Sequence, residues 1–299
     1  MSTVDPSVEW AHTTDVESVS AIDRALRVHR VSDSEFDGEY AELGLGRVYG
    51  GQLIGQCILA AAATVPEELR LHSVHVHFLA AGAAQPARFQ VEHLRQSKSF
   101  GTRMVHATQG GQRLAVAVAS FARDRPGLRH QADMSEARPP ACYPTRSEGL
   151  RHAFGPTIPG HVGADWPIET RYVDWVPWKP DGHGEPRNRL WMRVPGDIIT
   201  GETTVLAGLG FMSDLPMFEP ILRVSDVTWR DVLNGQGFYG ASLDHTIWIH
   251  EPPTGGRWLL FELESPSAAR SRALATGRFF TEDGTLVATV AQELLHVVQ

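Results

Sequence analysis

The sequence predicts an α+β fold in which one unit, an antiparallel β-sheet wrapped around a buried α-helix, occurs twice. First, residues 47–66 contain a stretch that is apolar on nearly every side, as buried helices are. Second, residues 71–121 have the alternation and turn signals of successive strands. Third, a similar series of segments returns about 172 positions further along the chain, which indicates a duplication.

The first helix is expected in the stretch RVYGGQLIGQCILAAAATVP. Its apolar run is too short to span a bilayer, so burial inside a protein core is the better explanation. Gln52 and Gln56, four residues apart, form its only polar stripe. Pro66 should end the helix, because the residue before a proline resists helical angles.

The strands of the first unit are delimited by alternation and by turn residues. We expect them at residues 37–45, 71–79, 86–94, 101–108 and 112–121. The last two flank Gln109-Gly110-Gly111, which is typical of a tight hairpin turn. A proline-rich segment follows, and it should cross the surface as a linker.

The second unit repeats the pattern. Strands are expected at 168–175, 189–194, 242–250, 258–263, 275–281 and 285–294, with a helix at 203–217. The chain then divides into an extension (1–30), a first repeat (31–125), a linker (126–167) and a second repeat (168–299). Because each sheet alone would leave an open edge, the two sheets should pair edge to edge.

The composition narrows the classes of protein that fit. A length of 299 residues allows two domains, and a net charge of −8 argues against a general nucleic-acid binder. The two cysteines, Cys57 and Cys142, match no metal or redox spacing and suit a reducing cytoplasm. Neither a signal peptide nor a membrane span is expected.

Asp214 is the first candidate for chemistry, because an acid stands in the apolar stretch GLGFMSDLPMF. Pro216 should place it at a helix end or bend. An acid in such surroundings is typical of a functional site. The alternative is a structural acid that caps the helix.

Gln292 and Ser242 are weaker candidates. Gln292 is an amide on a strand face shared with Leu286, Ala288, Val290 and Leu294. Such an amide needs hydrogen-bond partners, and the backbone often supplies them. Aligning GGQRLAVAVASF with EDGTLVATVAQEL matches Gln292 to the shorter Ser120. Ser242 opens a strand, where serine is routine.

Three other segments resemble functional motifs but do not match them. GASLD ends in aspartate and is not a nucleophile elbow, and GLGRVYG lacks the spacing of a dinucleotide loop. His72, His75 and His77 match no zinc spacing, and on a strand they do not share one face. No metal site is therefore expected.

Several segments in register resemble the TesB-like acyl-CoA thioesterase II family. They are RVYGGQLIGQCILAA, LHSVHVHFLAAG, SFGTR, VASF, MSDLPMF, SLDHTIWIH and EDGTLVATVAQE. The resemblance implies a double hotdog fold, in which two sheets each wrap a helix within one chain. It also implies hydrolysis of fatty acyl-CoA to fatty acid and coenzyme A, without a cofactor, in a homo-oligomer.

The resemblance assigns a catalytic trio to Asp214, Ser242 and Gln292, with serine where the family more often has threonine. Asp214 would act as general base on a water held by the other two side chains. The start of the first helix, Gly50-Gly51-Gln52, would bind the substrate carbonyl through backbone N–H groups. Arg272 is the arginine assigned to the coenzyme phosphates; other candidates for that contact are Arg47, Arg103 and Arg270.

Two other functions remain open from the sequence. A hotdog enoyl-CoA hydratase would pair its aspartate with a histidine five residues on, where this chain has Glu219. A non-catalytic acyl-CoA-binding protein would use the same pocket without three polar groups directed at one water.

Overall fold

The computed structural model describes residues 16–154, 166–178, 184–195, 201–233 and 236–298. The strands of the first half are β1 (Val28–Arg30), β2 (Glu35–Gly38), β3 (Arg70–Phe78), β4 (Arg88–Gln96), β5 (Phe100–Gln109) and β6 (Gln112–Ala122). Those of the second half are β7 (Glu169–Tyr172), β8 (Arg187–Arg193), β9 (Phe238–Ser242), β10 (Asp244–Ile249), β11 (Leu259–Ala269), β12 (Arg272–Thr281) and β13 (Leu286–Val298). The helices are α1 (Val16–Ala25), α2 (Gly50–Ala62), η1 (Pro140–Cys142), α3 (Arg146–Phe154), α5 (Glu202–Ser213), η2 (Leu215–Phe218), α6 (Glu219–Arg223) and α7 (Trp229–Leu233).

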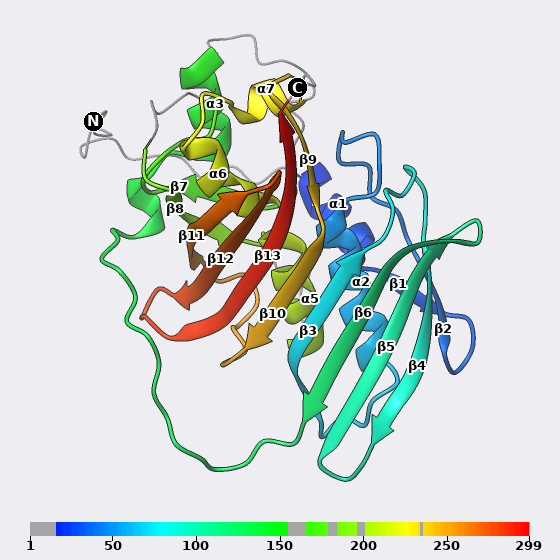
Figure 1. Ribbon diagram of the computed structural model, residues 1–299. Helices are drawn as coiled ribbons and strands as arrows, with labels where there is room; N and C mark the ends of the chain where they lie inside the picture. Colours follow the sequence, from blue (N-terminus) through cyan, green and yellow to red (C-terminus); the bar gives the residue numbers. More distant parts are fainter. Residues whose placement is uncertain (1–15, 155–165, 179–183, 196–200, 234–235, 299) are drawn as a thin grey trace.

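The strands form one continuous antiparallel sheet in the order β1-β2-β4-β5-β6-β3-β10-β13-β12-β11-β8-β7, with β9 also paired to β13 (Figure 1). The two halves join where β3 pairs with β10, for example Val74 opposite Ile247. The expected edge-to-edge pairing of the two sheets is therefore confirmed. Figure 1 shows each half of the sheet curving around a helix, which is the double hotdog arrangement that the resemblance implies.

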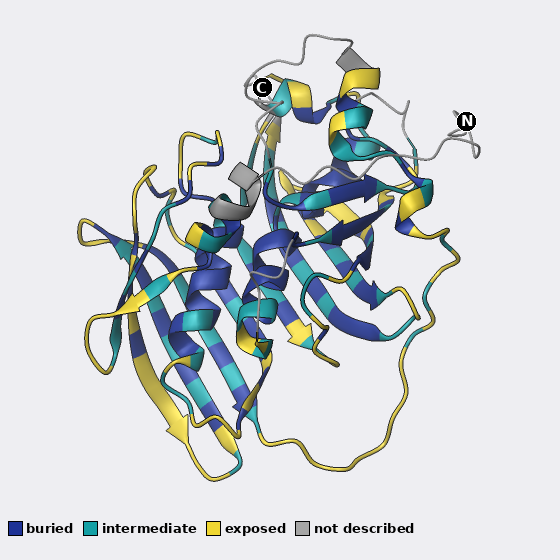
Figure 2. Cartoon of the chain, turned by 180° about the vertical axis from the view of Figure 1, so that it is seen from behind, coloured by how far each residue is buried: buried dark blue, intermediate teal, exposed yellow. Residues whose placement is uncertain are grey.

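The two central helices, α2 and α5, lie side by side against the sheet (Figure 2). Small residues allow this close approach. A Cβ on Gly55 of α2 would lie 2.9 Å from the carbonyl oxygen of Ala207, and one on Gly210 of α5 would lie 2.8 Å from Ile54. This contact brings the beginning of α2 next to the end of α5, where the candidate site lies.

The strand expected at 37–45 is shorter in the structure, because only Glu35–Gly38 pairs as β2. The following segment instead bonds to the polar stripe on α2. The amide nitrogens of Gln52 and Gln56 each donate to the carbonyl oxygen of Glu39 at 2.7 Å. These side chains take the place of a neighbouring strand. The helix itself ends at Ala62, before Pro66.

A β-bulge decides which face Gln292 occupies. Phe279 pairs with Ala288 and Phe280 with Leu286, so Val287 has no partner across the ladder. The bulge turns Leu286 away from the helix and into a cluster with Trp191 and Trp258 on the other side of the sheet. The expectation that Leu286 shares the face of Gln292 is therefore wrong.

The same comparison corrects the counterpart of Gln292 in the first half. There the bulge falls at Leu114, because Ala107 pairs with Ala115 and Thr108 with Arg113. Counted from each bulge, Gln292 corresponds to Ala119 rather than to Ser120. Ala119 is buried and Ser120 is partly exposed, in agreement with this register.

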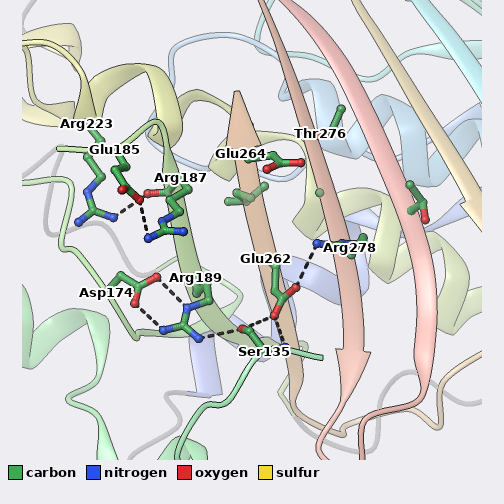
Figure 3. A pocket seen from close by; sticks show the side chains of 13 residues that line it. Ser135, Asp174, Glu185, Arg187, Arg189, Arg223, Glu262, Glu264, Thr276 and Arg278 are labelled. Carbon is green, nitrogen blue, oxygen red and sulfur yellow. Dashed lines mark hydrogen bonds and ion pairs between the residues drawn. The ribbon is translucent and has the colours of Figure 1, made fainter. Parts of the chain in front are cut away.

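The outer face of the second half carries a charged groove of about 860 Å³ between β8, β11 and β12 (Figure 3). Its arginines are paired with acids: Arg189 lies 2.7 Å from Asp174, and Arg278 lies 3.7 Å from Glu262. The groove lies on the face of the sheet opposite the central helices, so it is separate from the candidate site.

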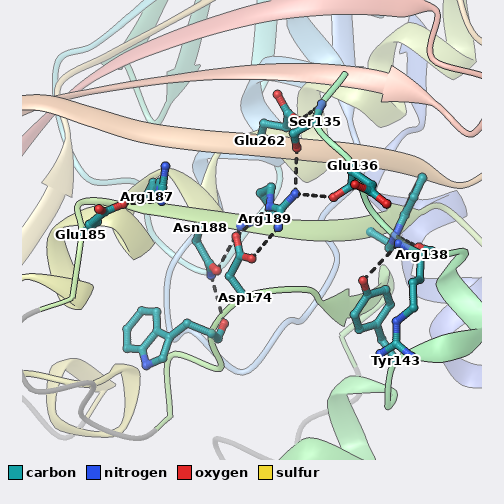
Figure 4. Close-up of polar contacts among 12 residues, drawn as sticks. Ser135, Glu136, Arg138, Tyr143, Asp174, Glu185, Arg187, Asn188, Arg189 and Glu262 are labelled. Atoms are coloured by element: carbon teal, nitrogen blue, oxygen red, sulfur yellow. Dashed lines mark hydrogen bonds and ion pairs between the residues drawn. The ribbon is translucent and has the colours of Figure 1, made fainter. Parts of the chain in front are cut away.

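Part of the segment after β6, from Ser135 to Tyr143, lies along this outer face (Figure 4). The backbone N–H of Ser135 donates to Glu262 at 2.8 Å, and Arg189 donates to the carbonyl oxygen of Glu136 at 2.8 Å. Tyr143 packs into the apolar cluster around Trp191. The linker thus covers apolar surface that the sheet alone would expose to water.

Residues 202–223 form a helical run that is long and apolar enough to cross a membrane by length and composition. In the structure 89% of its most apolar window is buried inside the protein. The core helix of a soluble fold passes the same test, so the composition of this run needs no membrane to explain it.

Candidate active site

Asp214 lies at the end of α5, directly before the tighter turn of η2, which begins at Leu215 and contains Pro216. The residue is only 4% exposed. Its side chain caps neither α5 nor η2, so the structure does not support the alternative of a purely capping acid. The helix end instead directs a carboxylate into the space between the two halves.

Ser242 and Gln292 meet Asp214 through hydrogen bonds. The hydroxyl of Ser242, at the end of β9, donates to Oδ1 of Asp214 at 2.8 Å. The amide Nε2 of Gln292, on β13, donates to the same hydroxyl oxygen at 2.9 Å. Gln292 is fully buried. Three segments that are distant in the sequence are thus joined through one hydroxyl group.

The beginning of α2 lies beside the second carboxylate oxygen of Asp214. A Cβ on Gly50 would lie 2.6 Å from Oδ2. The first helical hydrogen bond runs from Leu53 N to Tyr49 O, so the N–H groups of Gly50, Gly51 and Gln52 have no acceptor within the helix. A helix N-terminus of this kind favours negative charge. The side chain of Gln52, by contrast, is bonded to Glu39 and is not part of the site.

Tyr49 is a site residue that the sequence analysis missed. Its hydroxyl donates to the carbonyl oxygen of Phe211 at 3.0 Å and accepts from the N–H of Leu215 at 3.0 Å. These two backbone groups flank Asp214. Burial, and then the nearby Asp214, raise the pKa of Tyr49 well above its ordinary value, so the phenol stays protonated. The aromatic residue directly before Gly50-Gly51 was the only signal available in the sequence.

His245 is a second residue that was missed. It is fully buried, with Nδ1 against Oε1 of Gln292 and Nε2 at 2.9 Å from the hydroxyl of Ser213. Burial is the main cause that lowers the pKa of His245. The ring therefore lies directly behind the amide that bonds to Ser242.

At the two positions of the first half that correspond to Gln292 and Ser242, the structure has apolar residues. Ala119 stands where Gln292 stands in the second half. Leu71, opposite Phe121, corresponds to Ser242, opposite Leu294. The polar cluster therefore lies in the second repeat, where the resemblance assigned it.

Two of the arginines expected to contact the coenzyme phosphates, Arg103 and Arg272, lie away from the trio. Arg103 is 1% exposed and donates to Thr64, Arg95 and Gln96, so it is a structural residue and cannot meet a phosphate. Arg272 is about half exposed on the outer face of β12, where Nε donates to Glu293 at 3.1 Å. The structure therefore does not bring Arg272 together with the trio.

An apolar cavity begins directly beyond Asp214. Leu215 and Pro216 line it, together with eight aromatic and aliphatic side chains, namely Leu43, Leu45, Trp166, Tyr172, Trp178, Leu190, Met192 and Trp229. Glu219 also lines it, and burial raises the pKa of this carboxyl to about 8. Asn188 donates to Glu219 at 2.8 Å and Tyr172 donates to it at 3.1 Å.

Comparisons with known proteins agree with this arrangement. The model of the acyl-CoA thioesterase N-terminal domain matches residues 39–122, and that of the C-terminal domain matches residues 136–296. The chain is a member of the TesB-like acyl-CoA thioesterase II family. It is therefore a thioester hydrolase with a double hotdog fold.

Individual relatives align with this thioesterase over nearly its whole length. The chain is 31% identical to human acyl-coenzyme A thioesterase 8, over 93% of this chain and 89% of the relative. It is also 31% identical to acyl-CoA thioesterase 2 of Haemophilus influenzae, over 90% of this chain and 94% of the relative. The crystal structure of acyl-CoA thioesterase II TesB2 from Mycobacterium marinum superposes on this chain with a TM-score of 0.74 and 29% sequence identity. The superposition covers 93% of this chain and 99% of the crystal structure.

The structure gives little support to the alternative function of an enoyl-CoA hydratase. The position of the hydratase histidine holds Glu219, whose carboxyl is occupied by Asn188 and Tyr172. Across the residues that the structure describes, no three His, Cys, Asp or Glu side chains are grouped to hold a metal ion.

Proposed function

We propose that this thioesterase hydrolyses fatty acyl-CoA through a water molecule held by Asp214, Ser242 and Gln292. The observation that carries the proposal is their meeting at one hydroxyl: Ser242 donates to Asp214, and Gln292 donates to Ser242. A carboxylate, a hydroxyl and an amide arranged in this way can bind a water and orient one of its lone pairs toward a carbonyl carbon.

Asp214 is the general base. Its Oδ1 is engaged by Ser242, which leaves Oδ2, the oxygen nearest to Gly50, to take a proton from the water. Attack produces a tetrahedral intermediate with negative charge on the former carbonyl oxygen. The intermediate then collapses, the carbon–sulfur bond breaks, and the thiolate of coenzyme A leaves and takes up a proton.

The oxyanion is stabilised by the free N–H groups at the start of α2. Preorganised backbone donors that face a developing charge are worth about 3–4 kcal/mol in acyl transfer. The donors come from Gly50, Gly51 and Gln52 in the first half, whereas the base comes from the second half. The site therefore needs both halves of the chain.

The acyl chain is proposed to enter at the apolar cavity that starts at Leu215 and Pro216. The cavity volume is about 60 Å³, so the side chains that line it must move to admit a fatty acyl chain. Arg272, on the outer face of β12, stays a prediction as a contact for the coenzyme phosphates. A homo-oligomeric state and a cytoplasmic location also stay predictions.

In this proposal, Ser242 orients the water and is not itself acylated. Its hydroxyl bonds to Asp214 and Gln292 rather than to a histidine that could act as its base. Rapid-quench mass spectrometry with a fatty acyl-CoA tests this point. We expect free coenzyme A and fatty acid to appear together, with no acylated protein at any time. An acyl group on the peptide that contains Ser242 would contradict the proposed mechanism.

A further inference from the structure

His245 makes contacts that the proposed reaction does not use. The ring is fully buried behind Gln292, in contact with the amide oxygen on one side and with Ser213 on the other. A histidine without access to solvent cannot contact substrate or exchange a proton with it directly. Its hydrogen-bonded connection to Ser242 passes through Gln292.

The orientation of the Gln292 amide decides how the trio is connected. With Nε2 toward Ser242, the amide donates to the hydroxyl oxygen, and the single proton of Ser242 is directed to Asp214. With the amide reversed, Oε1 would face Ser242 and compete with Asp214 for that proton. The two ends of an amide have nearly the same shape, so hydrogen bonds alone select between them.

We propose that His245 is a positioning residue that carries its proton on Nδ1 and donates it to Oε1 of Gln292. This bond holds Nε2 of Gln292 toward Ser242. The inference rests on the proposed function, because orientation of the amide matters only if the trio holds the water.

Ser213 completes the arrangement from the other side of the ring. Its hydroxyl lies 2.9 Å from Nε2 of His245 and 3.1 Å from the carbonyl oxygen of Gly210, so two acceptors compete for its single proton. Donation to Nε2 of the neutral ring goes with the tautomer that carries its proton on Nδ1. In the proposed arrangement, a directed series of hydrogen bonds runs from His245 through Gln292 and Ser242 to Asp214.

Substitution separates positioning from simple packing. His245→Phe keeps the volume of the ring but removes the donor, and His245→Asn places an amide N–H close to the position of Nδ1. His245→Phe should lower kcat by about 10- to 100-fold, as loss of an orienting partner does at other sites, with little change in KM. His245→Asn should recover most of the lost activity. The matched control is His250→Phe, which removes an exposed histidine that directly follows β10 and is bonded to Thr289 of β13.

A double variant tests whether the effect passes through the amide. In a Gln292→Ala background, His245→Phe should cause no further loss of kcat, because non-additivity is expected for groups that act as a unit. The ¹⁵N resonances of the His245 imidazole should show the proton on Nδ1. Full activity of His245→Phe, equal losses in the Phe and Asn variants, an additive loss in the double variant or a neutral ring protonated on Nε2 would each overturn the inference.

Failure of this inference can be distinguished from failure of the proposed function. If Asp214→Asn is inactive while His245→Phe is fully active, only the positioning role is wrong. If Asp214→Asn is fully active, the trio is wrong and the positioning role falls with it. Should His245→Phe not fold, His245→Asn and the ¹⁵N measurement still decide the question.

Discussion

A side chain on Gly50 would lie 2.6 Å from Oδ2 of Asp214, so the first residue of one central helix leaves room for the carboxylate at the end of the other. The two residues come from different halves of the chain. In the proposed mechanism, the space between them receives the water and the thioester carbonyl.

Gly50→Ala should therefore reduce turnover strongly. The added methyl group would displace the carboxylate or block the attacking water, and we expect kcat to fall by about 10²-fold, as when transition-state groups are misplaced. Gly55→Ala is the matched control on the same helix, because its methyl group would meet Leu26 and Ala207 instead. That variant should lose stability but retain kcat in its folded form. Thiol release and thermal unfolding of both variants measure the difference.

Tyr49→Phe removes the hydroxyl that bonds to the backbone on both sides of Asp214. The loss should cost about 1–3 kcal/mol of unfolding free energy, because a buried carbonyl and a buried N–H lose their partner. It should also lower kcat by about tenfold as Asp214 becomes less firmly placed. Tyr40→Phe removes a hydroxyl bonded to Glu42 in an exposed contact and should change neither quantity. Unchanged stability and turnover in Tyr49→Phe would show that the hydroxyl does not position Asp214.

Much of the fold was visible in the sequence because periodicity and turn residues act locally. Gly110 and Gly111 have positive φ angles at the expected hairpin, where other residues would be strained, and Gly284 has one in the turn between β12 and β13. The buried helix, the linker and most strands followed from similar signals. The segment after β2 did not, because it satisfies its hydrogen bonds with Gln52 and Gln56 rather than with a strand.

The candidate site was only partly visible. The resemblance supplied Asp214, Ser242 and Gln292, but the bulge at Val287, which turns Gln292 inward, depends on pairing between distant strands. Tyr49 and His245 act through contacts across more than thirty positions of the chain. Such contacts have no local pattern that a single sequence could reveal.

Glu219 predicts a pH dependence of stability. The unfolded carboxyl ionises near its ordinary pKa of 4.5, whereas the folded one keeps its proton until its pKa of about 8. The contribution of Glu219 to stability is therefore complete below about pH 4.5 and is lost as the pH rises toward 8. At about 1.4 kcal/mol per pKa unit, the loss is on the order of 5 kcal/mol at most.

Glu219→Gln should remove most of this slope, because the amide can still bond to Asn188 or Tyr172 but cannot ionise. Urea unfolding between pH 5 and pH 8.5 would measure it. Glu68→Gln, at an exposed position, should behave as the wild type does. An equally steep decline in Glu219→Gln would show that another group causes the pH dependence.

Arg103→Met tests the structural role of the buried arginine in the first half. The substitution leaves Thr64 and the carbonyl oxygen of Arg95 without their donor, and we expect a loss of about 2–4 kcal/mol in unfolding free energy. The kcat of the folded variant should not change. Arg113→Met, on the exposed hairpin, is the control and should leave stability unaltered. A loss of turnover without a loss of stability would instead place Arg103 in substrate binding.

The most direct measurement is the kcat of Asp214→Asn for a fatty acyl-CoA, followed by release of free thiol and compared with Asp244→Asn. Asp244 is the first residue of β10, and its carboxylate accepts a hydrogen bond from the backbone N–H of Glu293 on β13. The side-chain oxygen of asparagine can keep this bond. If Asp214 is the general base, its variant should fold, bind substrate and turn over about 10²- to 10⁴-fold more slowly, while the control stays close to wild type. Near-normal turnover by Asp214→Asn would contradict the proposed mechanism.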